Sequence, residues 1–124
     1  MFVLKKAGSF KWPVSFTMPG DGGIQEEFSF DAEFKQLGQK RINEIREEGT
    51  RRQKEIEEGL QASSDLSDVS IAEENLLGWD GITDGENEVP FTKATKKQVL
   101  DVPMLASRLV ETYFEALADQ KLKN

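Results

Sequence analysis

The feature that most constrains the fold is a strict alternation of apolar and polar side chains near the start of the chain. Every second residue is apolar across residues 10–18, and the same alternation returns across residues 28–34. A period of two is typical of a β-strand with one buried face. Residues 19–23 read Pro-Gly-Asp-Gly-Gly, and glycines supply the positive φ angles that a tight reversal needs. The pattern therefore predicts an antiparallel hairpin.

One face of this hairpin is expected to hold six large apolar side chains. They are Trp12, Val14, Phe16, Phe28, Phe30 and Phe34. Pro13 has no N–H to donate, so the first strand is predicted to lie at a sheet edge or to bulge at this residue. A hairpin alone is only marginally stable, so the aromatic face needs a cover. Residues 2–4 are a candidate third strand.

The C-terminal part carries the clearest helical pattern. Its apolar residues recur on one broad face: Val102, Leu105, Ala106, Leu109, Val110, Tyr113, Phe114 and Leu117. Asp101 is the expected N-cap, and Pro103 is expected in the first turn, where its missing N–H costs nothing. A shorter helix is expected at 95–100. We expect the long helix to cover the aromatic face of the hairpin.

Residues 39–60 are predicted to form a charged helical arm. Twelve of the nineteen residues from Lys40 to Glu58 are charged, and opposite charges recur four residues apart. The apolar stripe is thin, consisting of Ile42, Ile45, Ile56 and Leu60. A helix this polar buries little surface. It is either a charged surface helix with no special duty or an arm whose isoleucines bind a partner helix.

A serine-rich linker is expected at 61–70, followed by a short helix. That helix is predicted to begin near residue 68 or 70, with Glu73 and Glu74 in its first turn, and to end at Gly78. Next comes a loop anchored by four apolar residues, Trp79, Ile82, Val89 and Phe91, with a tight turn at residues 84–85. A calcium loop does not fit here, because Ile82 and Phe91 would occupy ligand positions. The preferred interpretation is a small irregular hairpin that caps the core.

Taken together, these elements predict one α+β domain spanning residues 1–124. An N-terminal antiparallel β-hairpin or small sheet (1–38) is covered by C-terminal amphipathic helices in a mainly helical region (71–124). The charged helical arm (39–60) and the linker (61–70) lie between them.

Composition narrows the possible functions. The chain has no histidine and no cysteine, so thiolate and imidazole chemistry, disulfides and histidine–cysteine metal sites are excluded. No catalytic residue, cofactor or metal ligand set is predicted, and an enzyme is disfavoured. No apolar run approaches the ~20 residues of a spanning helix, and the N-terminus does not resemble a secretory signal. A soluble, intracellular protein without membrane contact is expected.

The negative charge is concentrated in one stretch. The chain has 16 Lys plus Arg against 23 Asp plus Glu, for a net charge of −7. Residues 61–91 carry eight of the carboxylates and no Lys or Arg. No basic stripe elsewhere compensates, so nucleic-acid binding is not expected. The simplest interpretation of the stretch is a solvated loop.

Three groups of residues together resemble the tail assembly chaperones of long-tailed bacteriophages of the lambda-like type. The first is the Phe-x-Phe-x-Ala-x-Phe alternation at 28–34, which runs into a charge-rich helix. The second is Leu-Gly-Trp-Asp-Gly-Ile at 77–82 followed by Val-Pro-Phe at 89–91. The third is Val-Leu-Asp-Val-Pro at 99–103, then a helix with Tyr113 and Phe114. The arm and the serine linker match least well.

The resemblance implies a non-enzymatic role in tail assembly. Such chaperones coat the tape measure protein and bring in the major tail protein. They act in the cytoplasm of the host bacterium, in many copies, and are absent from the mature virion. Six residues are our candidates for partner binding or self-association: Ile42, Ile45, Ile56, Trp79, Ile82 and Phe91. The competing interpretation is that Trp79 and Phe91 belong to the ordinary core.

Two other classes of protein remain open. An acidic DNA-mimic inhibitor would present carboxylates in place of phosphates, and DNA would compete for its partner in a salt-dependent manner. A structural head–tail connector would be found in purified particles, whereas a transient chaperone would not.

Overall fold

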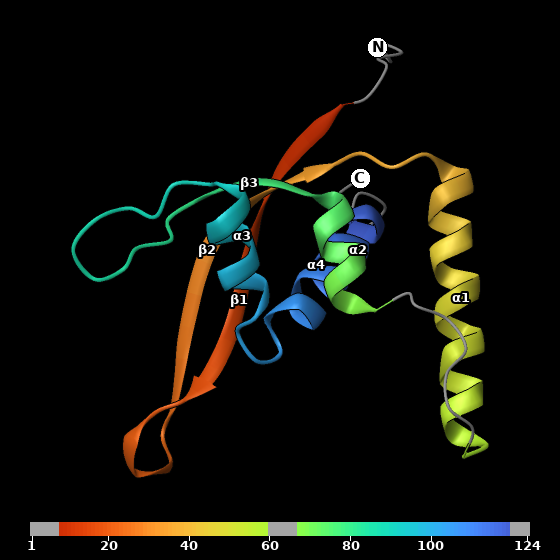
Figure 1. Ribbon diagram of the computed structural model, residues 1–124, viewed down its shortest axis with the longest axis horizontal. Coiled ribbons are helices and arrows are strands. Elements are labelled where there is room, and N and C mark those ends of the chain that lie inside the picture. Colours follow the sequence, from red (N-terminus) through yellow and green to blue (C-terminus); the bar gives the residue numbers. More distant parts are fainter. Residues whose placement is uncertain (1–7, 60–66, 120–124) are drawn as a thin grey trace.

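The computed structural model describes residues 8–59 and 67–119. Within these ranges, a three-stranded antiparallel sheet combines with four α-helices, which confirms the predicted α+β class (Figure 1). The elements in order are β1 (Ser9–Pro19), a 3₁₀ turn (Asp21–Gly23), β2 (Gln25–Lys35), α1 (Gln39–Glu57), α2 (Asp68–Asn75), β3 (Leu76–Asp80), α3 (Lys93–Leu100) and α4 (Leu105–Asp119).

The predicted hairpin is present as β1 and β2. Val14 lies opposite Phe30 and Trp12 opposite Ala32, so the even-numbered residues of both strands share one face. Gly22 and Gly23 both adopt positive φ in the turn, as the sequence requires of a tight reversal. The even-numbered face supplies Val14, Phe30, Ala32 and Phe34 to the core. The predicted hairpin, with its even-numbered apolar residues on one face, is therefore confirmed.

β1 forms an edge of the sheet among the described residues, since the strand order is β1–β2–β3. Backbone bonds at the two ends of the hairpin join Gly8 to Gln36 and Gly20 to Ile24, both even-numbered pairs. Because bonded and non-bonded pairs alternate in an antiparallel ladder, the odd-numbered residues of β1 direct their N–H and C=O groups outward. Pro13 and Pro19 are among these and lack the N–H. The outward carbonyl of Ser15 accepts a 2.7 Å bond from Arg108 Nε.

α4 covers the even-numbered face of the hairpin. Leu105, Leu109 and Tyr113 are at most 3% exposed, and the Tyr113 ring packs edge-on against Phe34 with centroids 5.4 Å apart. The Tyr113 hydroxyl donates to the Lys35 carbonyl at 2.9 Å and accepts from the Leu37 N–H at 3.1 Å. The long amphipathic helix is thus confirmed as the cover. It also holds the connection from β2 to α1.

The third strand differs from the prediction. The short helix was expected to continue to Gly78, but α2 ends at Asn75 and Leu76–Asp80 is β3, paired with β2 through Ala32↔Trp79. Pairing with β2 satisfies the backbone groups of this segment and buries Leu76 completely. The expected start near residue 68 is confirmed: Ser67 caps α2 by accepting from the Ser70 N–H at 3.1 Å. The candidate strand at residues 2–4 lies outside the described residues.

The start of α4 and the place of Glu73 and Glu74 within α2 also need correction. Asp101 does not cap α4; its N–H bonds to Lys97 and Gln98 carbonyls and ends α3 instead. Pro103 precedes α4, because Met104 has a left-handed backbone with φ 69° that breaks the helical path. Glu73 and Glu74 lie late in α2 rather than in its first turn. α3 begins at Lys93, two residues earlier than predicted, after the Thr92 cap.

α1 confirms the predicted charged helix and stands to one side of the other elements (Figure 1). The loop after β3 lies on the opposite side of the sheet and helices. Of the helix's isoleucines, Ile42 and Ile45 near its start are buried, whereas Ile56 near its end is 53% exposed.

Candidate partner-binding surface

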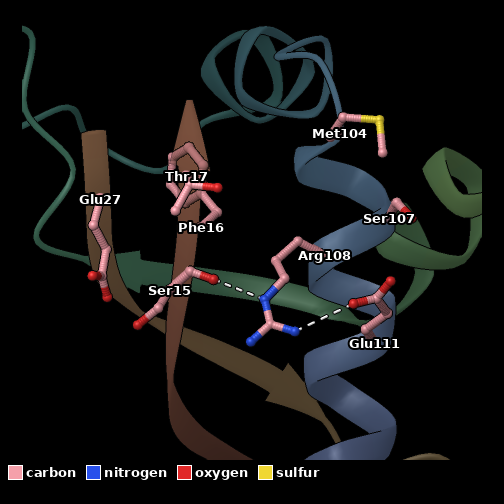
Figure 2. A pocket seen from close by; sticks show the side chains of 8 residues that line it. All are labelled: Ser15, Phe16, Thr17, Glu27, Met104, Ser107, Arg108 and Glu111. Carbon is pink, nitrogen blue, oxygen red and sulfur yellow. Dashed lines mark hydrogen bonds and ion pairs between the residues drawn. The ribbon is translucent and has the colours of Figure 1, made fainter. Parts of the chain in front are cut away.

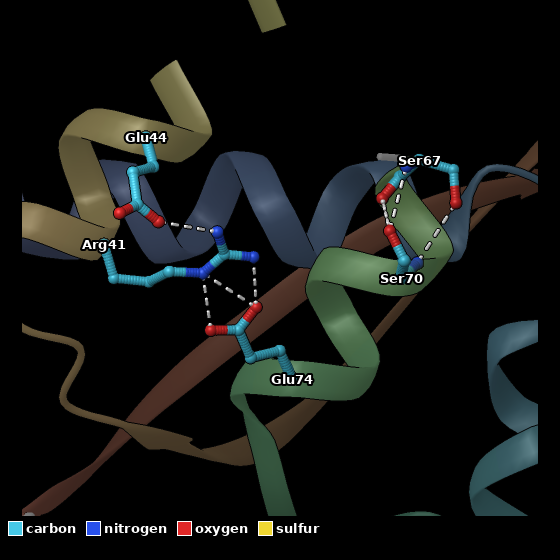
Figure 3. A network of polar contacts seen from close by, with 5 residues as sticks. All are labelled: Arg41, Glu44, Ser67, Ser70 and Glu74. Atoms are coloured by element: carbon cyan, nitrogen blue, oxygen red, sulfur yellow. Dashed lines mark hydrogen bonds and ion pairs between the residues drawn. The ribbon is translucent and has the colours of Figure 1, made fainter. Parts of the chain in front are cut away.

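The base of α1 is fixed by an ion pair to α2. Both Nε and Nη2 of Arg41 bond to the Glu74 carboxylate, with shortest distances of 2.8 and 2.7 Å, and Nη1 bonds to Glu44 at 3.1 Å (Figure 3). The guanidinium hydrogen bonds hold the pKa of Glu74 below its ordinary value, and the two carboxylates raise the pKa of Arg41. A fork-on-carboxylate contact fixes geometry as well as charge. The first turns of α1 therefore have one defined orientation.

Two of the predicted partner-binding residues lie in this fixed base. Ile42 is 6% exposed and Ile45 is 3% exposed. The next residue, Arg46, places its guanidinium 5.2 Å from the centre of the Phe114 ring on α4. The two isoleucines therefore do not present a free stripe to solvent in this conformation, and their part in partner binding stays a prediction.

The outer half of α1 has a different character. Ile56 is half exposed, and the face formed by Arg46, Gly49, Thr50, Gln53, Lys54 and Glu57 borders an open hollow. Most of these side chains are polar, so the outer half of α1 offers one apolar side chain in a charged setting. Ile56 is the member of the predicted isoleucine stripe that a partner can reach.

The other three candidates border one hollow, Trp79 from the end of β3 and Ile82 and Phe91 from the loop that follows it. The indole N–H of Trp79 donates to the Val89 carbonyl at 2.8 Å, and its ring meets Phe91 edge-on with centroids 4.7 Å apart. Ile82 is half-buried and packs against the core, and Phe91 is 36% exposed. The sequence-based prediction that these apolar residues belong to one local structure is therefore confirmed. They are separated from Ile56 because α1, which carries Ile56, lies on the opposite side of the sheet and helices from this loop (Figure 1).

Local hydrogen bonds shape this loop. One oxygen of Asp84 accepts from the backbone N–H groups of Asn87 and Glu86, each at 2.9 Å, and this lowers the pKa of its carboxyl. Gly85 follows with φ 103°, and Thr83 pairs with Glu88 across the turn. Lys96 on α3 lies 5.7 Å from the Phe91 ring centre, and its partial burial lowers the pKa of its ammonium group. The expected small irregular hairpin is therefore present.

Two hollows at the closed end of the β1–β2 hairpin were missed by the sequence analysis. One, of about 320 Å³, lies between β1 and α4 and is bordered by Phe16, Met104 and Arg108 (Figure 2). The second, of about 290 Å³, is bordered by Phe16, Phe28, Ile82, Val99, Val102 and Leu105. Phe28 is 43% exposed and Met104 is 78% exposed. Exposed apolar side chains around a hollow are typical of a surface that contacts another molecule.

These features define the chain as a small α+β protein with apolar side chains on several surfaces. Within the described ranges, no group of acidic side chains is arranged to hold a metal ion. None of the helices described there is long and apolar enough to cross a membrane. The exposed apolar side chains, Ile56, Phe28, Phe91 and Met104 among them, are typical of a surface that contacts another molecule.

Comparison with known proteins supplies the family. A family model described as phage tail assembly chaperone matches residues 1–124, and the chain belongs to that family. Membership indicates a non-enzymatic role with protein partners in tail assembly. Neither the curated proteins nor the solved structures give a significant match.

Proposed function

We propose that this protein binds the tape measure protein during tail assembly, keeps it soluble and extended, and helps to recruit the major tail protein. The observation that carries the proposal is the match to the tail assembly chaperone family over the whole chain. A tape measure is a long, largely helical client whose apolar stripes would aggregate without a cover. The proposed site of action is the cytoplasm of the infected bacterium, and the mature virion is proposed to lack the protein.

The exposed apolar side chains support this proposal. Ile56 on α1 and Phe91 on the loop are accessible, while Trp79 and Ile82 support the loop from beneath. We include these four residues in the partner-binding surface, with Ile42 and Ile45 holding the base of the arm. Separate contact points on opposite sides of one small protein suit a chaperone that binds a long client in many copies and also contacts its neighbours.

The test is co-expression with the tape measure protein of the same phage. The expected result is that the tape measure protein moves from the pellet to the supernatant and is recovered in a complex with this chain. The matched control is the Leu109→Asp variant, which we expect to be unfolded and inactive. If the tape measure protein stays insoluble and no complex forms with the unaltered chain, the proposal is wrong.

A second experiment addresses the alternative role as a structural component. Purified tails and virions are examined by mass spectrometry for peptides of this chain. A chaperone is expected to be absent or far below one copy per tail. Stoichiometric retention in the particle would instead identify a connector.

A further inference from the structure

We infer that the two hollows at the closed end of the β1–β2 hairpin form one docking groove, the hairpin groove, for an amphipathic helix that carries lysine or arginine beside its apolar face. The hollows share Phe16, so they are neighbours. Phe16 and Phe28 stack 5.7 Å apart between their centroids. The inference rests on the proposed function only in taking the occupant to be a helix of a partner protein.

The groove exists because the hairpin is longer than its cover. The closed end of β1 and β2 projects beyond α4 (Figure 1), so the aromatic face continues past the helices that bury it elsewhere. Val14 and Phe34, farther along this face, are fully buried, whereas Phe28 is 43% exposed. Phe28 thus shares the face of the core residues but lacks their cover. An incoming helix would supply the missing layer.

Met104 provides the second apolar wall and an unusual backbone. It is the one non-glycine residue with positive φ among the described residues, at 69°, and its side chain is 78% exposed. A left-handed conformation is unfavourable for a residue with a Cβ atom, which comes too close to the following carbonyl oxygen. A glycine would avoid that cost, yet the position holds a flexible thioether that adapts to irregular apolar surfaces. The arrangement presents Met104 at the mouth of the hollow (Figure 2).

Charge identifies the chemistry of the occupant. The second hollow is lined by uncharged side chains alone. The first hollow is lined by two carboxylates, Glu27 and Glu111, and by one arginine. The one arginine at the first hollow, Arg108, already contacts Ser15, Glu111 and Glu115. An apolar floor bordered by the Glu27 carboxylate, with the one lining arginine already engaged, favours a helix with basic flanks over one with acidic flanks.

The size of the hollows suits side chains of a helix. Each is about 300 Å³, too small for a second layer of secondary structure but sufficient for large anchoring side chains. Adjacent hollows match residues three or four positions apart on one helical face, the usual manner in which an amphipathic helix enters a groove.

The experiment uses the full chain and two synthetic peptides. Both are 18-residue helices with leucines at the i, i+3, i+4, i+7 spacing; lysine fills the flanking positions in one peptide and glutamate in the other. Binding is measured by calorimetry at low and high salt. We expect the lysine peptide to bind, its affinity to fall with salt, and the glutamate peptide not to bind. Equal binding of both peptides would overturn the inference.

Two variants separate groove binding from general attraction between a basic peptide and an acidic protein. Phe28→Ser and Met104→Gly remove the two walls, and each is expected to weaken binding of the lysine peptide about tenfold. Met104→Gly removes the positive-φ strain, so it keeps the test valid even if Phe28→Ser does not fold. The matched control is Ile56→Ser, which removes a similarly exposed side chain from α1 and should change affinity by less than about twofold. Unchanged binding by Met104→Gly refutes the groove.

Sedimentation of the same proteins addresses the other occupant. If the unaltered chain self-associates and Met104→Gly makes it monomeric, the groove holds a second copy of this chain and the inference is wrong. Failure here is also distinct from failure of the proposed function. A Met104→Gly variant that still solubilises the tape measure protein fully would leave that function intact and exclude the groove as its site.

Discussion

The hydroxyl of Tyr113 offers the sharpest test of the packing. It bonds to the Lys35 carbonyl and the Leu37 N–H, at 2.9 and 3.1 Å, and the tyrosine is fully buried. Tyr113→Phe keeps the ring and its contacts but removes both bonds. At a net value of about 1 kcal/mol for each hydrogen bond, the free energy of unfolding should fall by about 2 kcal/mol. For a domain of this size, the melting temperature should fall by about 8 °C.

The adjacent residue supplies a matched control. Thr112 is 2% exposed, and its hydroxyl has no hydrogen-bond partner in the described structure. Thr112→Val therefore also deletes one buried hydroxyl from α4, but no hydrogen bond is lost. We expect the free energy of unfolding to stay unchanged or to rise by about 1 kcal/mol. Urea denaturation followed by circular dichroism measures both variants. If the two variants lose equal stability, or Tyr113→Phe loses less than about 0.5 kcal/mol, the account of the Tyr113 contacts is wrong.

Tyr113 also makes the stability of the fold depend on pH in the alkaline range. Burial raises the pKa of the Tyr113 phenol above its ordinary value of 10.0, despite the opposing bond from Leu37. The unfolded chain therefore releases the phenolic proton first as pH rises, and stability should fall above about pH 10. Tyr113→Phe removes this part of the loss. Because Tyr113 is the only tyrosine of the chain, absorbance at 295 nm follows its ionisation directly.

Two further perturbations test the arm and the core. Glu74→Gln should lower the free energy of unfolding by about 0.5–1 kcal/mol at pH 7. Because the Arg41 contact lowers the pKa of Glu74, the difference in stability between the variant and the unaltered chain should vanish as pH falls well below 4.5. A difference that persists at pH 2.5 in urea titrations would contradict this account. Leu109→Asp should abolish cooperative thermal melting, because it places an unpaired charge at a fully buried site. Arg51→Ala on the exposed arm should shift the melting temperature by less than about 2 °C.

The sequence predicted the elements whose side chains follow one clear period. The alternation at 10–18 and 28–34 fixed both strands of the hairpin, and the apolar face of residues 105–117 fixed α4. β3 was missed because Leu76 and Leu77 continue the apolar pattern of the preceding helix, and only pairing with β2 makes this segment a strand. The start of α4 was misplaced because Asp101 and Pro103 are good helix starters, and no local signal indicates a left-handed Met104.

The candidate site was only partly visible for a similar reason. Trp79, Ile82 and Phe91 were recognised because they are apolar residues within a polar stretch, and the structure shows that all three border one hollow. The exposure of Phe28 depends on how far α4 extends along the hairpin, which no spacing in the sequence specifies. Ile42 and Ile45 are buried at the base of α1, where the Arg41–Glu74 contact joins segments that are distant in the sequence, and no local pattern specifies such a contact.

The outward edge of β1 affects the tendency of this protein to aggregate at high concentration. An exposed edge strand can pair with the same strand of a neighbouring molecule, and repeated pairing produces fibres. Here two prolines interrupt the row of donors, and a guanidinium occupies an acceptor near its middle. Stacking of molecules strand against strand would leave gaps in the new ladder. The outward side of β1 is therefore a poor template for strand pairing between copies of the folded protein.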